Sequence, residues 1–140
     1  LIQHFGENSM KEYPQAGSTM VLPGDLIKGG LCMSGMYDLK PVRLSKRSAY
    51  VKFTDAMEDA LSTQRHLARI NCPVVLAYGT YETPEFQRQS RDFADAVRAA
   101  GKPASLIVGA GYNHFELLET LANPDFQHRV YGIVDCGSLL

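Results

Sequence analysis

The 140 residues carry a formal net charge of −1 and are 45% hydrophobic, which is the composition of an ordinary soluble globular domain. A nearly neutral chain gives no reason to expect a nucleic acid or a membrane surface as partner, and no apolar run approaches the ~20 residues of a membrane span. Three cysteines, odd in number and far apart, favour reduced thiols in a cytoplasmic protein over a disulfide framework or a metal site.

The first part of the chain predicts few regular elements. Residues 1–21 show no sustained hydrophobic period, whereas the apolar run over 26–33 is compatible with a buried strand. We expect Asp38 to cap a helical turn that Pro41 cuts short. The basic and polar residues 43–48 then predict a solvated loop.

A helix and a buried strand are predicted in the middle of the chain. Thr54 is a candidate N-cap, followed by acidic residues that suit the first turn of a helix, and the helical pattern breaks near Ser62. The apolar residues 74–78 show no alternation, as expected of a strand that is covered on both faces.

The next helix has clear signals at both ends. Thr83 precedes Pro84, a residue that fits the first helical position, and Gly101 stands at the predicted stop. One face of this helix is predicted to be apolar, with Phe86, Phe93, Val97 and Ala100. Residues 104–108 predict a further strand, and 115–121 a last helix that ends at Asn123 and Pro124.

Alternating strands and helices with short connections predict an α/β fold with a parallel sheet. Three strands are few for this length, and the first would leave an open sheet edge. We therefore expect residues 22–124 to be the carboxyl-terminal portion of a larger α/β domain, flanked by the unpatterned segments 1–21 and 125–140.

Two polar residues follow neighbouring strands where ligand-binding groups collect in parallel sheets. Glu82 comes after the strand at 74–78, and His114 comes after the strand at 104–108 and a glycine-rich turn. A carboxylate that orients an imidazole forms two-thirds of a hydrolase triad, yet no G-x-S-x-G nucleophile motif occurs in the chain. The alternatives are an exposed, inert His114 beside a helix start and a solvated Glu82; Glu85 suits a first-turn helix acid better than a triad member.

Other polar candidates have weaker support. Ser18 has no strand before it and no helix after it, so a nucleophile elbow is unsupported there. Ser34 follows a predicted strand, but a role in capping the next turn is favoured over a role as nucleophile. Three histidines without a predicted partner are read as surface residues: His4, His66 and His128.

Three segments together resemble the arylformamidases (kynurenine formamidases) of the α/β-hydrolase superfamily. They read SGMYDLKP at 34–41, TPEFQRQS at 83–90 and NHFE at 113–116, in the order and spacing of the last third of such an enzyme. The resemblance implies that Glu82 is the triad acid, where the family often has aspartate, and that His114 is the triad histidine. It further implies hydrolysis of a small-molecule formamide, ester or related acyl bond, such as that of N-formylkynurenine, without metal or organic cofactor.

The resemblance stops on both sides of 22–124. Residues 1–21 match neither the serine elbow nor the oxyanion loop of the family, so we expect an incomplete chain with negligible turnover of its own. Two other functions stay open: a broad carboxylesterase or amidase of the same superfamily, and a non-catalytic α/β module that binds a partner through its open sheet edge. The oligomeric state is not predicted.

Overall fold

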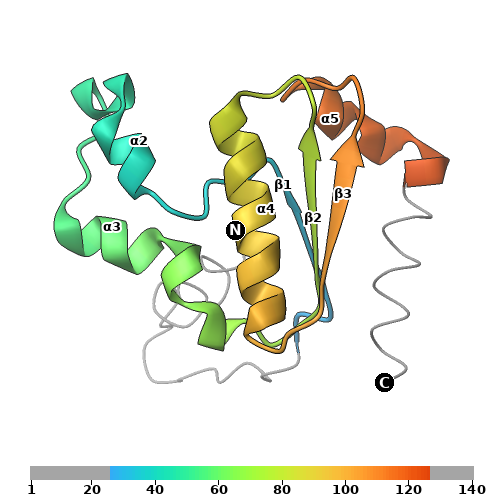
Figure 1. Cartoon of the computed structure of the whole chain (residues 1–140), viewed down its shortest axis with the longest axis horizontal. Helices are drawn as coiled ribbons and strands as arrows, with labels where there is room; N and C mark the ends of the chain where they lie inside the picture. The colour runs from blue at the N-terminus through green and yellow to red at the C-terminus, as the bar shows by residue number, and fades with distance from the viewer. Residues whose placement is uncertain (1–25, 127–140) are drawn as a thin grey trace, which may run out of the picture.

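A computed structural model describes residues 26–126 and contains a parallel sheet between helical layers (Figure 1). The strands are β1 (Gly30–Met33), β2 (Val74–Gly79) and β3 (Ala104–Gly109), in the order β1-β2-β3. The α-helices are α2 (Lys40–Leu44), α3 (Asp55–Leu61), α4 (Pro84–Ala99) and α5 (Glu116–Glu119). Four short 3-10 helices are η1 (Lys46–Ala49), η2 (Thr63–Arg65), η3 (Leu67–Arg69) and η4 (Thr120–Ala122). The predicted α/β class is confirmed. Residues 1–25 and 127–140 lie outside the described residues, and with them the predicted segment 1–21 and most of the predicted segment 125–140.

The central strand β2 is buried along its whole length, as its unbroken apolar run predicts. The predicted first strand is shorter than expected, because it pairs with β2 only from Gly30, which lies opposite Val74. Residue 73 is a proline, and its carbonyl accepts the first bond of the edge, from the N–H of Gly30 at 2.9 Å. Pairing therefore starts where β2 starts, and residues 26–29 precede the sheet.

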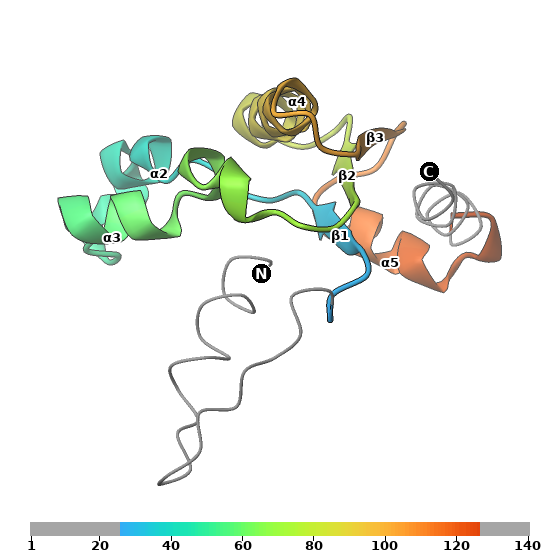
Figure 2. The same ribbon diagram turned by 90° about the horizontal axis from the view of Figure 1, so that it is seen from below.

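Helices cover both faces of the sheet, as Figure 2 shows with α4 above the strands and α5 below them. Phe93 and Val97 of α4 pack on one face against the apolar side chains of Val74, Leu76 and Tyr37. Leu117 of α5 packs on the other face with Val75, Ala77 and Ile107. Burying one such side chain contributes roughly 1.5–3 kcal/mol, so each face fixes one helix beside the carboxyl ends of the strands.

Both ends of α4 lie where the sequence predicts them. Pro84 opens the helix after Thr83, although the Thr83 side chain makes no capping hydrogen bond. Gly101 follows the helix with φ +73°, a left-handed conformation that glycine adopts without strain. The predicted apolar face is wrong at Ala100, which is exposed because the helix has already ended at Ala99.

The segment after β1 differs from the prediction of a turn and a solvated loop. Pro41 does not end the helical turn but lies in the first turn of α2, where its missing N–H has no helical partner to lose. The helix runs to Leu44, and Ser45 then accepts a hydrogen bond from Arg47 to start η1. Asp38 does bond the N–H of Lys40, as a residue before a helix often does.

Helix α3 begins and ends as predicted. The hydroxyl of Thr54 accepts the N–H of Met57 at 3.1 Å, which caps the first turn. The helix stops at Leu61, and the buried hydroxyl of Ser62 donates back to the carbonyl of Glu58 at 2.6 Å. None of the helices within residues 26–126 is long and apolar enough to cross a membrane.

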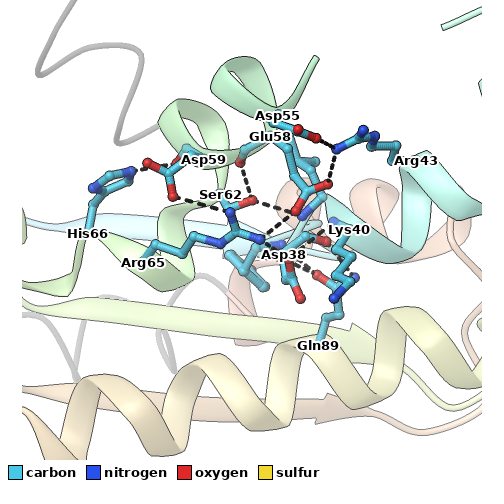
Figure 3. Close-up of polar contacts among 12 residues, drawn as sticks. Asp38, Lys40, Arg43, Asp55, Glu58, Asp59, Ser62, Arg65, His66 and Gln89 are labelled. Atoms are coloured by element: carbon cyan, nitrogen blue, oxygen red, sulfur yellow. Dashed lines mark hydrogen bonds and ion pairs between the residues drawn. The ribbon is translucent and has the colours of Figure 1, made fainter. Parts of the chain in front are cut away.

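A buried carboxylate ties the helices of this segment together (Figure 3). Glu58 is only 7% exposed and receives hydrogen bonds from Arg65 at 2.6 Å and from Arg43 at 3.1 Å. The hydrogen bond from Arg65, and then that from Arg43, lowers the pKa of Glu58 from its usual range. The ionised carboxylate thus joins α2, α3 and η2 into one unit beside the sheet.

Candidate active site

Two loops meet at the carboxyl ends of β2 and β3, at the top of the sheet in Figure 1. The N–H of Thr80 donates to the carbonyl of Gly109 at 2.9 Å, and that of Tyr81 donates to Tyr112 at 3.0 Å. The N–H of Gly111 donates in return to the Thr80 hydroxyl at 2.8 Å. The loop after β2 and the loop after β3 are therefore hydrogen-bonded to each other along their length.

Glu82 and His114 contact each other at this edge. The Nδ1 atom of His114 lies 2.6 Å from Oε1 of Glu82, whose side chain is completely buried. The other carboxylate oxygen accepts the N–H of Gly79 at 3.0 Å. With an ionised carboxylate, which can only accept, this contact assigns the hydrogen of a neutral imidazole to Nδ1 and leaves Nε2 with a free lone pair. The predicted contact is confirmed, while the catalytic role of the pair remains a prediction.

Aromatic rings flank the imidazole. The ring of Phe86, from α4, lies 4.6 Å from the His114 ring between centroids, with 35° between the planes. Phe115 meets the imidazole edge-on, at 5.5 Å and 87°. The imidazole remains 40% exposed, so it is held by its neighbours and still accessible to a ligand.

Local hydrogen bonds stabilise the turn at 113–116 through which the loop after β3 enters α5. The side-chain oxygen of Asn113 accepts the N–H groups of Phe115 and Glu116 at 2.9 and 3.0 Å. The carboxylate of Glu116 accepts the N–H of Asn113 at 2.9 Å, which makes the capping reciprocal. His114 is enclosed within this turn, which fixes its backbone.

Neither Ser34 nor Glu85 takes part in a hydrogen bond with Glu82 or His114 among the contacts of the described residues. Ser34 follows β1 with φ 51° and is 8% exposed, and its hydroxyl has no hydrogen-bond partner. The favoured role of Ser34 as a turn cap is therefore wrong. Glu85 bonds Arg88 and Gln89 on α4, which confirms it as a helix acid.

His66 has a partner that the sequence did not predict. Its Nε2 lies 2.7 Å from the carbonyl of Asp59, in the unit formed by α2 and α3 (Figure 3). Ser18, His4 and His128 lie outside the described residues.

Three residues that support the Glu82–His114 contact were not singled out from the sequence. Gly79 donates its N–H to the carboxylate, Thr80 bridges the two loops, and Gln87 donates from its amide to the carbonyls of Thr80 and Glu82 at 3.1 and 2.8 Å. In the sequence, these residues are marked only by their proximity to Glu82. The contact between Thr80 and Gly111 joins segments that are 31 residues apart, so it depends on the tertiary fold.

The chain is similar to two kynurenine formamidases, while no protein-family profile matches it. The enzyme of Danio rerio is 28% identical over 105 residues, and that of Salmo salar is 30% identical over 106 residues. Each comparison covers 71% of this chain and 36% of the relative. The chain thus spans about a third of the length of these relatives.

Solved structures show the same arrangement of strands and helices. A putative thioesterase from Silicibacter sp. TM1040 superposes with a TM-score of 0.64 at 24% identity, over 72% of this chain and 37% of that one. The tabun-modified esterase 2 of Thermogutta terrifontis gives 0.52 at 18% identity, over 76% and 42%. The fold is therefore that of part of an α/β-hydrolase. In sequence, the chain is similar to the matching third of the two kynurenine formamidases.

Proposed function

We propose that this chain supplies the acid and the base of a Ser-His-acid triad in a hydrolase of arylformamidase type. The observation that carries the proposal is the hydrogen bond between His114 Nδ1 and the buried carboxylate of Glu82. Its position after β2 and β3 suits this role, because reactive groups of parallel sheets collect at the carboxyl ends of the strands.

Each residue has one task in the proposed reaction. Nε2 of His114 removes the hydroxyl proton of a serine as that oxygen attacks the acyl carbon, and it then donates the proton to the leaving amine or alcohol. Water, activated by the same nitrogen, releases the acid and regenerates the serine. Glu82 stays ionised throughout, holding the imidazole in one tautomer and stabilising the imidazolium that forms.

The serine of this proposal is not among the 140 residues in a recognisable elbow. We propose that the nucleophile is a glycine-flanked serine outside these residues, and that residues 1–140 alone hydrolyse substrate at a negligible rate. The proposed substrate is a small formamide, such as N-formylkynurenine, or a related ester. The steps above require no metal or organic cofactor.

A fusion enzyme tests the proposal. The part of the Danio rerio kynurenine formamidase that precedes the matched region is joined to this chain, and hydrolysis of N-formylkynurenine and of aryl esters is measured. We expect turnover that falls about 10⁴-fold in kcat in Glu82→Gln and at least as far in His114→Ala. His66→Ala, in the outlying helical unit, is the matched histidine control and should retain kcat.

Three results would count against parts of this proposal. Unchanged kcat in His114→Ala would remove the triad assignment. Hydrolysis of esters but not of the formamide would favour a general carboxylesterase. Stoichiometric labelling of the 140-residue chain itself by a fluorophosphonate probe would show that the chain contains its own nucleophile.

A further inference from the structure

The hydrogen bond to Glu82 does not by itself fix the imidazole of His114. It restrains one atom of a ring that is 40% exposed, so the ring can still tilt about the line joining Nδ1 to the carboxylate. Proton transfer depends strongly on where Nε2 lies, since a misplacement of about 1 Å can cost 10²-fold in rate. A second contact is therefore needed to fix the position of Nε2.

Phe86 provides that restraint from a different element. Its ring lies against the imidazole in a tilted arrangement, with 4.6 Å between centroids and 35° between the planes, and it extends from the first turn of α4. Phe115 also touches the imidazole, at 5.5 Å, but it is the next residue in the chain and moves with the same loop. Phe86 is thus the contact that relates the His114 ring to the rigid helix layer.

Gln87, the next residue of α4, acts on the other partner. Its side-chain amide donates to the carbonyl of Glu82 at 2.8 Å and to that of Thr80 at 3.1 Å. The amide nitrogen has two hydrogens, and both are used on the same loop. The backbone on each side of Tyr81 is thereby fixed to α4, and with it the direction from which the Glu82 carboxylate approaches the imidazole.

The two side chains can reach two different loops because neighbouring helical residues point about 100° apart. The helix that carries them is itself immobilised, since Phe93 and Val97 further along α4 are fully buried against the sheet. A single helical turn therefore contacts both members of the pair from one rigid support.

We propose that the first turn of α4 is a positioning element for the Glu82–His114 pair, with Phe86 holding the imidazole and Gln87 holding the backbone of the acid. Neither residue is proposed to touch the substrate. The importance of this element for turnover rests on the proposed function, whereas its effect on the geometry of the pair can be measured without any activity.

The experiment is nuclear magnetic resonance on the whole 140-residue chain with labelled histidine. The Nδ1–H proton, hydrogen-bonded to Glu82, should give a far-downfield signal, and the carbon-bound ring protons of His114 should be shifted upfield by the face of Phe86. Glu82→Gln and His114→Ala assign these signals. Phe86→Leu removes the ring but keeps an apolar side chain, Phe86→Tyr restores the ring, and Gln87→Leu removes both amide donors.

We expect Phe86→Leu to lose the upfield shift and to exchange the Nδ1–H proton with water severalfold faster. Phe86→Tyr should restore both properties. Gln87→Leu should also weaken or abolish the Nδ1–H signal. Gln64→Leu is the control, because Gln64 is half-buried in η2 and its backbone N–H bonds Tyr37 away from the pair.

A wild-type Nδ1–H signal and exchange rate in both Phe86→Leu and Gln87→Leu would overturn the proposal. If Phe86→Leu fails to fold, as backbone amide spectra would reveal, an unchanged Gln87→Leu overturns it alone. In the fusion enzyme the same variants should lower kcat about 10-fold to 100-fold with little change in KM. If Phe86→Leu and Gln87→Leu lose the Nδ1–H signal but the fusion enzyme shows no activity, the positioning role is supported and the proposed function is contradicted. The two proposals can therefore fail independently.

Discussion

The replacement of Gly79 by alanine tests how closely the two site loops must approach each other. Gly79 is the last residue of β2, and a Cβ atom there would lie 2.1 Å from the carbonyl oxygen and 2.8 Å from the carbonyl carbon of Tyr112. Both atoms belong to the backbone of the loop that carries His114, so no side-chain rotation can relieve the contact. Restoring an ordinary separation requires the loops to move apart by about 1 Å.

That movement has two consequences with estimable magnitudes. Overpacking of this kind costs about 1–3 kcal/mol, and loosening the bond from the Tyr81 N–H to the same Tyr112 carbonyl costs about 0.5–1.5 kcal/mol more. Replacing a strand glycine returns about 0.5–1 kcal/mol. We therefore expect a net loss of about 0.5–4 kcal/mol. The Glu82–His114 contact should widen as well, because the Gly79 N–H itself bonds the carboxylate.

Urea unfolding and the Nδ1–H signal of His114 measure these two consequences in Gly79→Ala. Gly101→Ala is the matched control: its φ is +73°, and a Cβ there would meet nothing within 4 Å. The control should lose about 1–2 kcal/mol through backbone strain alone and keep the signal. The reasoning is refuted if Gly79→Ala retains wild-type stability and an unchanged Nδ1–H signal.

Three further predictions concern stability, pH and thiol reactivity. Phe93 is fully buried and stacks on Tyr37 at 4.1 Å and 7°; Phe93→Ala should cost about 3–5 kcal/mol and Phe93→Leu less, by urea unfolding, because Leu leaves a smaller cavity, and equal losses in both would contradict this cavity argument. Because its partners lower the pKa of Glu58, the carboxylate contributes stability that is fully present above the usual pKa of about 4.3 and is lost as pH falls through the folded value. The urea midpoint should thus fall more steeply below pH 5 in the wild type than in Glu58→Gln, and parallel curves would contradict this. Desolvation raises the pKa of the partly buried Cys32 to about 11, so about one thiol in a thousand is ionised at pH 8. Alkylation followed by peptide mass spectrometry should be slow and accelerate about tenfold per pH unit, and rapid modification at pH 8 would contradict the raised pKa.

Sequence predicted the elements whose signals are local. The run at 74–78 became the central strand because a strand covered on both faces needs apolar residues throughout. The ends of α4 followed from Pro84 and Gly101, which act through their own backbone preferences. The helices α2 and η1 were missed, and Arg43 of α2 is held by Glu58, a partner 15 residues away that no local signal reveals.

The candidate site was predicted in part for the same reason. Glu82 and His114 were found because each follows a strand, and position after a strand is visible in the sequence. The supporting contacts were not predicted, because those of Phe86 and Gln87 depend on how α4 packs beside the two loops. Ser34 is a candidate for which the prediction from sequence was wrong. The expected capping hydrogen bond is absent, and its hydroxyl is buried without a partner.

The contacts that hold Glu82 and His114 come from a small part of the fold. Every hydrogen bond that orients Glu82, and each ring that touches His114, comes from β2, α4 or the loop between β3 and α5. None of these contacts involves β1, which is one of the two edge strands of the sheet among residues 26–126. The acid and the imidazole can therefore be pre-organised by two strands and one helix alone. Polar groups that are already positioned can stabilise charge during a reaction without first having to rearrange. A serine placed beside the carboxyl ends of β2 and β3 would contact an imidazole whose position and tautomer are already fixed.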